Sequence, residues 1–221
     1  MTATRQIGPS KVKNTGRVSS SKNDRSAAFE SLLERDFLTL LDFDLDVVKF
    51  QEQPVTIEYT GGEGERRHYT PDVFVLFRQG SQRQRPEPTL YEVKPRSVLF
   101  SEWATLKPKF RAARRYATGQ GWRFKIVTEQ EIRGPYLQNV QFLRQFRGGN
   151  EKKLEFSEAL LNLLLQQSLS TPRALVTTLL QDPMNQARAI RTLWKLVAHH
   201  RIGMDLTQPI SMESPIWNVL E

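Results

Sequence analysis

The chain has 221 residues, 38% of them hydrophobic and 25% charged, so it can bury one ordinary core or two small ones. Its formal net charge of +8 at pH 7 indicates a polyanionic partner, because clustered Lys and Arg gain affinity by releasing counterions from phosphates. The absence of cysteine excludes disulfides and Cys-ligated zinc, and it fits a reducing cytoplasm. No apolar run reaches the length of a membrane span, so we expect no membrane partner.

The first half of the chain predicts a flexible arm, one helix and a series of strands. Residues 1–25 contain almost no large apolar side chains, so we expect a basic arm there. Apolar residues at spacings of three and four predict a helix over 26–41. Strands are predicted over 47–50, 55–59, 66–77 and 89–93, with Gly61 and Gly62 in a hairpin turn.

The second half predicts mainly helices. A basic helix with Pro108 inside it is expected over 101–118, a strand over 122–127, and a helix over 129–146 that Gly134 and Pro135 interrupt. Composition changes at 148–150, which places a domain boundary there. We therefore expect an α/β domain over 26–147 and a small helical domain over 151–221.

Two short segments carry most of the chemical information, YTPDVFV at 69–75 and YEVKP at 91–95. Alternate residues of a strand share a face, so Glu92 and Lys94 point the same way, and Asp72 heads a neighbouring strand. Two carboxylates can hold Mg²⁺, which activates a water and offsets charge on a scissile phosphate, while Lys94 stabilises that phosphate. The pattern therefore predicts a nuclease, although a surface ion pair on a sheet has the same spacing.

A further acid is expected from the first helix. Glu30 and Glu34 lie four residues apart and so share one helical face. Either side chain could reach the metal, and their spacing does not choose between them.

Several segments in order resemble the TnsA family, the endonuclease subunits of heteromeric, Tn7-like transposases. They are residues 29–37, 47–48, 51–54, 69–72 and 91–95. The resemblance spans residues 15–133 and implies a restriction-endonuclease-like fold of the PD-(D/E)xK type that cuts the 5′ ends of the transposon. It also implies three partners: double-stranded DNA at the transposon ends, a TnsB-like transposase that cuts and joins the 3′ ends, and a TnsC-like AAA+ regulator.

Carried over residue by residue, the resemblance implies Glu34, Asp72, Glu92 and Lys94 as the catalytic set. The metal ligands would be Glu34, Asp72, Glu92 and the backbone carbonyl of Val93, with Mg²⁺ as cofactor and Mn²⁺ as a substitute. The best-known member has Gln where this chain has Glu92, so this chain restores the usual nuclease pattern. We expect the protein to act in the bacterial cytoplasm, at the nucleoid.

The last 70 residues predict a winged helix. Helices are expected over 154–167, 173–180 and 185–199, followed by strand-like alternation over 201–206 and 210–219. Basic residues that could contact DNA are Lys107, Lys109, Arg111 and Arg114 in the first domain, and Arg188, Arg191 and Lys195 in the second. The second set fits a face for protein contact equally well, and the family resemblance allows either DNA or the regulator there.

The sequence thus favours a Mg²⁺-dependent DNA endonuclease subunit of a cut-and-paste transposase. One alternative is a stand-alone PD-(D/E)xK nuclease, such as a restriction or junction-resolving enzyme. The other is an inactive nuclease fold that serves as a DNA-binding assembly module.

Overall fold

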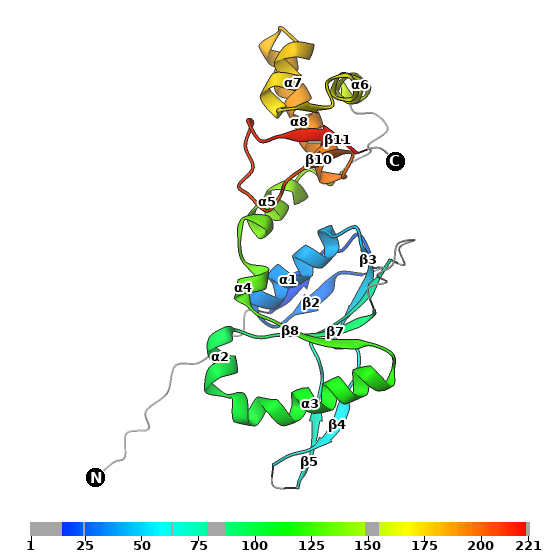
Figure 1. Ribbon diagram of the computed structural model, residues 1–221, viewed down its shortest axis with the longest axis vertical. Coiled ribbons are helices and arrows are strands. Elements are labelled where there is room, and N and C mark those ends of the chain that lie inside the picture. The colour runs from blue at the N-terminus through cyan, green and yellow to red at the C-terminus, as the bar shows by residue number, and fades with distance from the viewer. Residues whose placement is uncertain (1–14, 24, 63, 79–86, 149–154, 220–221) are drawn as a thin grey trace, which may run out of the picture. The chain divides into compact units, whose positions relative to one another are not determined.

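The structure, a computed structural model, describes residues 15–23, 25–62, 64–78, 87–148 and 155–219 (Figure 1). Contacts between residues divide it after Ile132 into two units, each of which is described by itself. The fold is mixed α/β, as expected. No helix among the described residues is long and apolar enough to cross a bilayer.

The first unit is built on a four-stranded sheet in the order β3-β6-β7-β8. Its strands are β3 (Val47–Glu52), β6 (Val73–Phe77), β7 (Thr89–Val93) and β8 (Arg123–Val127). Strands β7 and β8 are parallel, and the other pairs are antiparallel. All five residues of β7 are buried, as expected for a central strand covered on both faces.

Helices α1 (Leu32–Phe43) and α3 (Trp103–Gly119) cover opposite faces of this sheet (Figure 1). Phe37 and Leu41 of α1 pack with Val73 and Val93, whereas Phe110 of α3 packs with residues of β8 on the other face. The short helix α2 (Arg96–Ser101) joins β7 to α3, and α4 (Glu129–Ile132) follows β8. Because side chains of β7 alternate between faces, Val93 faces α1 and Glu92 faces α3.

The N-terminal part differs from the prediction. Helix α1 begins at Leu32, not at residue 26, because Ser31 caps it and the preceding residues form β2 (Ala27–Phe29). Strand β2 pairs with β1 (Gly16–Val18), so part of the expected basic arm is ordered, and Val18 is buried. Residues 1–14 and 24 of the arm lie outside the described residues.

The predicted strand over 66–77 is two strands. Residues 66–69 form β5 (Arg66–Tyr69), which makes a hairpin with β4 (Ile57–Thr60), and β6 starts only at Val73. The break falls at Pro71, which has no N–H to donate to a ladder. Asp72 therefore lies directly before β6, where its side chain contacts Val93 at the end of β7.

The second unit contains four helices and a small antiparallel sheet among its described residues. The helices are α5 (Pro135–Arg144), α6 (Ser157–Gln167), α7 (Pro172–Leu179) and α8 (Pro183–Ala198). The strands are β9 (Leu169–Ser170), β10 (Ile202–Met204) and β11 (Ile216–Asn218), in the order β10-β11-β9.

Helix α5 belongs to this second unit, although the sequence placed the boundary after residue 147. The Asn139 side chain donates to the carbonyls of Leu206 and Gln208 at 2.9 and 2.7 Å. The Phe142 ring lies 5.2 Å from that of Trp194 in α8. These long-range contacts, which composition does not reveal, assign α5 to the C-terminal unit.

Candidate functional site

Asp72 is held at the carboxyl end of β7 by a backbone contact. The N–H of Val93 donates to Asp72 Oδ2 at 2.7 Å, and the N–H of Gln53 donates to the Asp72 carbonyl at 2.9 Å. The carboxylate is therefore fixed between β3 and β7 at the point where Lys94 leaves the sheet.

A hollow of about 370 Å³ opens beside Asp72. Glu34 from α1 and Lys94 from the end of β7 line it together with Asp72, and Glu30 also borders it. Three of the four predicted catalytic residues, from segments far apart in the sequence, therefore meet at one hollow.

Glu34 is oriented by the first turn of α1. Its Oε1 accepts from the Ser31 hydroxyl at 2.9 Å and its Oε2 accepts from the Glu30 N–H at 2.9 Å, while Ser31 caps the Glu34 N–H. The charge of Glu34 acts on both Asp72 and Lys94 by raising their pKa values. Glu30 borders the same hollow, but its Oε1 accepts from the Gln53 side chain at 3.0 Å. Glu30 precedes α1, whereas Glu34 lies within it and its charge acts on both Asp72 and Lys94, so Glu34 is favoured as the helical acid of the site.

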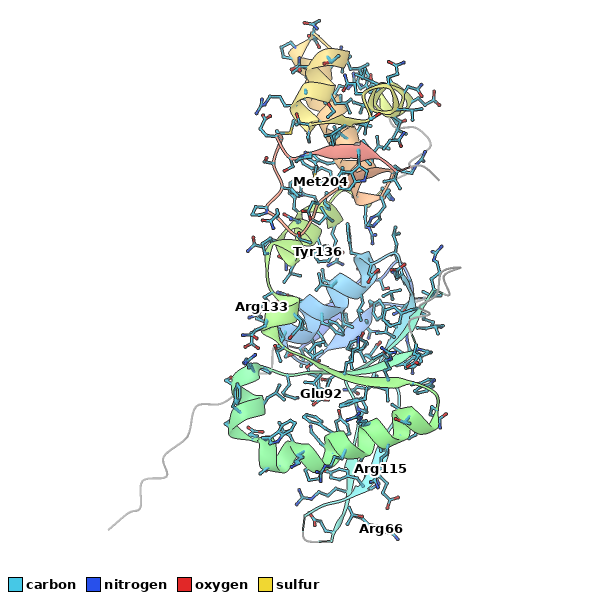
Figure 2. The ribbon with its side chains drawn as sticks, viewed as in Figure 1. Arg66, Glu92, Arg115, Arg133, Tyr136 and Met204 are labelled. Atoms are coloured by element: carbon cyan, nitrogen blue, oxygen red, sulfur yellow. The ribbon has the colours of Figure 1, made fainter. Side chains whose placement is uncertain are left out.

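Glu92 lies elsewhere, between the sheet and α3 (Figure 2). Its side chain is 1% exposed and does not border the hollow. Oε2 accepts from the Tyr69 hydroxyl at 2.5 Å, and Oε1 lies 3.2 Å from Lys94 Nζ and 3.3 Å from Lys109 Nζ. Both carboxylate oxygens are therefore occupied by protein groups.

Lys109 and Tyr69 are site residues that the sequence analysis missed. Lys109 was predicted to contact DNA, but its ammonium pairs with Glu92 and lies 4.7 Å from the centre of the Tyr69 ring. Helical periodicity could have indicated the buried position of Lys109, because residue 109 adjoins the apolar stripe of Leu106, Phe110 and Ala113.

Burial and neighbouring charges shift the pKa values of this cluster. Burial and the Glu92 charge raise the pKa of Asp72 to about 7, against the opposing effects of Lys94 and the Val93 N–H. Burial lowers the pKa of Lys94, but Glu92 and Asp72 outweigh it, so that this pKa rises above its ordinary value. Burial and Glu92 also raise the pKa of Tyr69. At neutral pH, Lys94 is therefore an ammonium and Tyr69 a phenol that donates.

The donor set around the hollow fits a hard divalent cation. Glu34 and Asp72 supply carboxylate oxygens, which Mg²⁺ prefers, and a cation there would oppose the burial and the Glu92 charge that raise the pKa of Asp72. Glu92 does not complete a triad: within the described ranges, no three acidic, His or Cys residues are placed to share a metal. Glu30 and Glu52 also border the hollow, where they accept from the Gln53 side chain and the Ala28 N–H, so the candidate ligands are Glu34 and Asp72.

The remaining basic residues predicted to bind DNA are divided between the units. Lys107, Arg111 and Arg114 are exposed on α3. On α8, Arg191 is exposed, Lys195 is half-buried, and Arg188 pairs with Glu155 at 2.6 Å.

The raised pKa of Asp72 predicts a dependence of stability on pH. The metal-free folded protein binds this proton more tightly than the unfolded chain, whose Asp pKa is near 3.8. The stabilisation from Asp72 is therefore complete below pH 3.8 and is lost as the pH rises through about 7. Between pH 5 and pH 8 the thermal unfolding midpoint of the wild type should therefore fall relative to that of Asp72→Asn, which lacks this titrating group.

Mg²⁺ should stabilise the wild type more at pH 8 than at pH 6, because the proton and the cation compete for Asp72. Asp72→Asn is the control and should show a much smaller gain at either pH. An Mg²⁺ effect that is equal at both pH values in the wild type would contradict this assignment.

Two family models match the chain. A TnsA-like endonuclease N-terminal model matches residues 44–129, and a TnsA endonuclease C-terminal model matches residues 131–206. The first contains Asp72, Glu92 and Lys94, and the two models meet close to the division found in the structure. No curated protein matches the chain.

Proposed function

This chain belongs to the TnsA endonuclease family, and we propose that it hydrolyses phosphodiester bonds at the 5′ ends of a transposon in a Mg²⁺-dependent reaction. Membership implies the endonuclease subunit of a Tn7-like transposase. The observation that carries the finer proposal is the meeting of Glu34, Asp72 and Lys94 at one hollow.

In this proposal, Glu34 and Asp72 hold the cation, and the Val93 carbonyl at the end of β7 is a further candidate ligand. When bound, Mg²⁺ would lower the pKa of a water ligand and offset the charge on the scissile phosphate. The Val93 N–H keeps Asp72 in place, and Ser31 keeps Glu34 in place. Both ligands are thus oriented before any substrate arrives.

Lys94 acts as a cation and not as a base. Its raised pKa keeps the ammonium protonated, so it has no lone pair with which to take a proton from water. It borders the hollow with Asp72, where it stabilises charge on the phosphate. Glu92 acts through Lys94: the 3.2 Å contact holds the ammonium in position, so Glu92 is a positioning residue in this arrangement.

We also infer a PD-(D/E)xK core for the first unit and a winged helix for the second. The first is supported by Asp72 directly before β6 and the Glu92-Val93-Lys94 segment at the end of the adjacent strand β7, in a sheet with helices on both faces. The second is supported by three helices, α6, α7 and α8, followed by the antiparallel pair β10 and β11.

Membership in the family also suggests which partners the subunit needs for transposition. We propose that the subunit acts on double-stranded DNA at transposon ends, with a TnsB-like transposase for the 3′ ends and a TnsC-like AAA+ regulator. Mn²⁺ should replace Mg²⁺, because both take oxygen ligands in similar geometry.

A strand-specific cleavage assay tests the proposal. End-bearing duplex DNA is incubated with Mg²⁺ and wild type, Asp72→Asn or Lys94→Ala, each alone and with the TnsB-like and TnsC-like partners. We expect 5′-end cuts that need the partners and are lost in both variants. Cutting by wild type alone would favour a stand-alone nuclease, and no cutting in any mixture would favour an inactive assembly module.

A further inference from the structure

One face of α3 carries a stripe of polar and aromatic side chains that is separate from the catalytic hollow. Its members are four, four, three and four residues apart and so share one side of the helix: Trp103, Lys107, Arg111, Arg114 and Thr118. They border an open groove of about 760 Å³, whose opposite wall is strand β8 with Lys125. We call this the α3–β8 groove. No described residue lines both it and the catalytic hollow.

Four of the five cations that line this groove have no ion-pair partner among the described residues. Arg123 pairs with Glu87 at 2.7 Å. In contrast, no described carboxylate pairs with Lys107, Arg111, Arg114 or Lys125. Four uncompensated positive charges on one open surface create a potential that attracts an anion.

The positive surface continues on the other flank of α3. There a second hollow of about 830 Å³, toward Thr60 of β4, is bordered by Arg111, Arg114 and Arg115. Figure 2 shows Arg115 on this helix. Because Arg111 and Arg114 border both hollows, α3 forms a basic ridge between two depressions.

The length of the stripe matches a nucleic-acid backbone. Lys107 and Arg114 are seven residues apart, which corresponds to about 10 Å along a helix. One strand of B-DNA advances about 3.4 Å per phosphate along its axis, so this stretch spans about three phosphates. Trp103, which is 46% exposed, adds a flat apolar surface at one end.

We propose that the α3–β8 groove binds the sugar-phosphate backbone of duplex DNA outside the cleavage site, through Lys107, Arg111, Arg114 and Lys125. This inference rests on the proposed function, since it takes DNA as the substrate. An acidic protein segment is the competing occupant. Duplex DNA fits better because cations border the hollows on both flanks of α3.

The test measures binding without cleavage. A labelled duplex is titrated with full-length protein in EDTA at several salt concentrations, and fluorescence anisotropy gives Kd at each. The main variant combines Lys107→Ala, Arg111→Ala and Lys125→Ala, all at exposed positions. Lys125→Ala and Lys49→Ala form a matched pair, because both lysines are exposed on edge strands, at opposite edges of the same sheet.

The triple variant should bind about tenfold or more weakly at moderate salt, and its plot of log affinity against log salt should be shallower by about two to three units. Lys125→Ala should lower the slope by about one unit, and Lys49→Ala should leave it unchanged. The proposal would be overturned if the triple variant bound DNA with the same affinity and the same salt slope as the wild type. Unchanged DNA binding with loss of partner-stimulated cleavage would also overturn it, and would assign the groove to an acidic protein segment.

Failure here is distinct from failure of the proposed function. Asp72→Asn should bind DNA with the wild-type salt slope, because Asp72 lies outside the groove. A wild-type protein that binds through the groove but never cuts would leave this inference standing and refute the nuclease.

Discussion

Replacing Asp72 with Asn should reduce Mg²⁺-dependent cleavage of transposon-end DNA by about 10³-fold, or to background. The amide removes the charge that Mg²⁺ requires from the carboxylate that the Val93 N–H holds at the end of β7. Asn keeps an oxygen that can accept from the Val93 N–H, which now donates to Asp72 at 2.7 Å. The loss should therefore appear in cleavage and metal binding, while the fold is retained.

The matched control is Asp46→Asn, at an exposed position before β3. It should cut like wild type in the strand-specific assay and bind Mg²⁺ equally well by calorimetry. If Asp72→Asn cut within a few-fold of wild type, the metal would have to be held by other groups. The proposed site would then be wrong, whatever the family membership.

Replacing Lys109 with Met should lower the free energy of unfolding by about 2 kcal/mol. Removing one member of a buried ion pair usually costs about 3–5 kcal/mol, because the other charge stays buried. Here Glu92 keeps Lys94 and the Tyr69 hydroxyl as partners, so the expected loss is smaller. Chemical denaturation with urea measures it directly.

A double-mutant cycle separates this ion pair from simple loss of packing. Glu92→Gln removes the buried charge, so Lys109→Met in that background should cost clearly less than in wild type. Lys107→Met is the matched control, because it makes the same change at an exposed position of the same helix, and it should stay within about 0.5 kcal/mol of wild type. Equal costs in both backgrounds would show that Lys109 does not stabilise Glu92.

Much of the local structure was predictable, for reasons that lie in short-range physics. Strand β7 coincides with the predicted strand at 89–93, and the hairpin at Gly61 and Gly62 is confirmed. The interruption of the helix near Gly134 is also confirmed, between α4 and α5. Periodicity, glycine and proline act over a few residues, so a sequence window contains the forces that decide these elements.

The errors occur where a distant segment competes with local preference. Residues 27–29 looked helical by spacing, but they pair with β1 and are followed by the Ser31 cap. Helix α5 joined the second unit because Asn139 and Phe142 find partners more than fifty residues away. Neither partner is visible in a window of neighbouring residues.

By itself, the sequence determined the family and the principal strands and helices, and it predicted Asp72, Glu92 and Lys94 as chemistry-bearing residues, because motif spacing and periodicity are local. Only the tertiary structure decided which of those residues lie at the same hollow. It placed Glu34, Asp72 and Lys94 at one hollow and turned Glu92 toward Lys109 and Tyr69 on the α3 face. The physical reason is burial: a carboxylate that is 1% exposed has to find partners from whichever elements pack over it, and packing is a property of the whole chain.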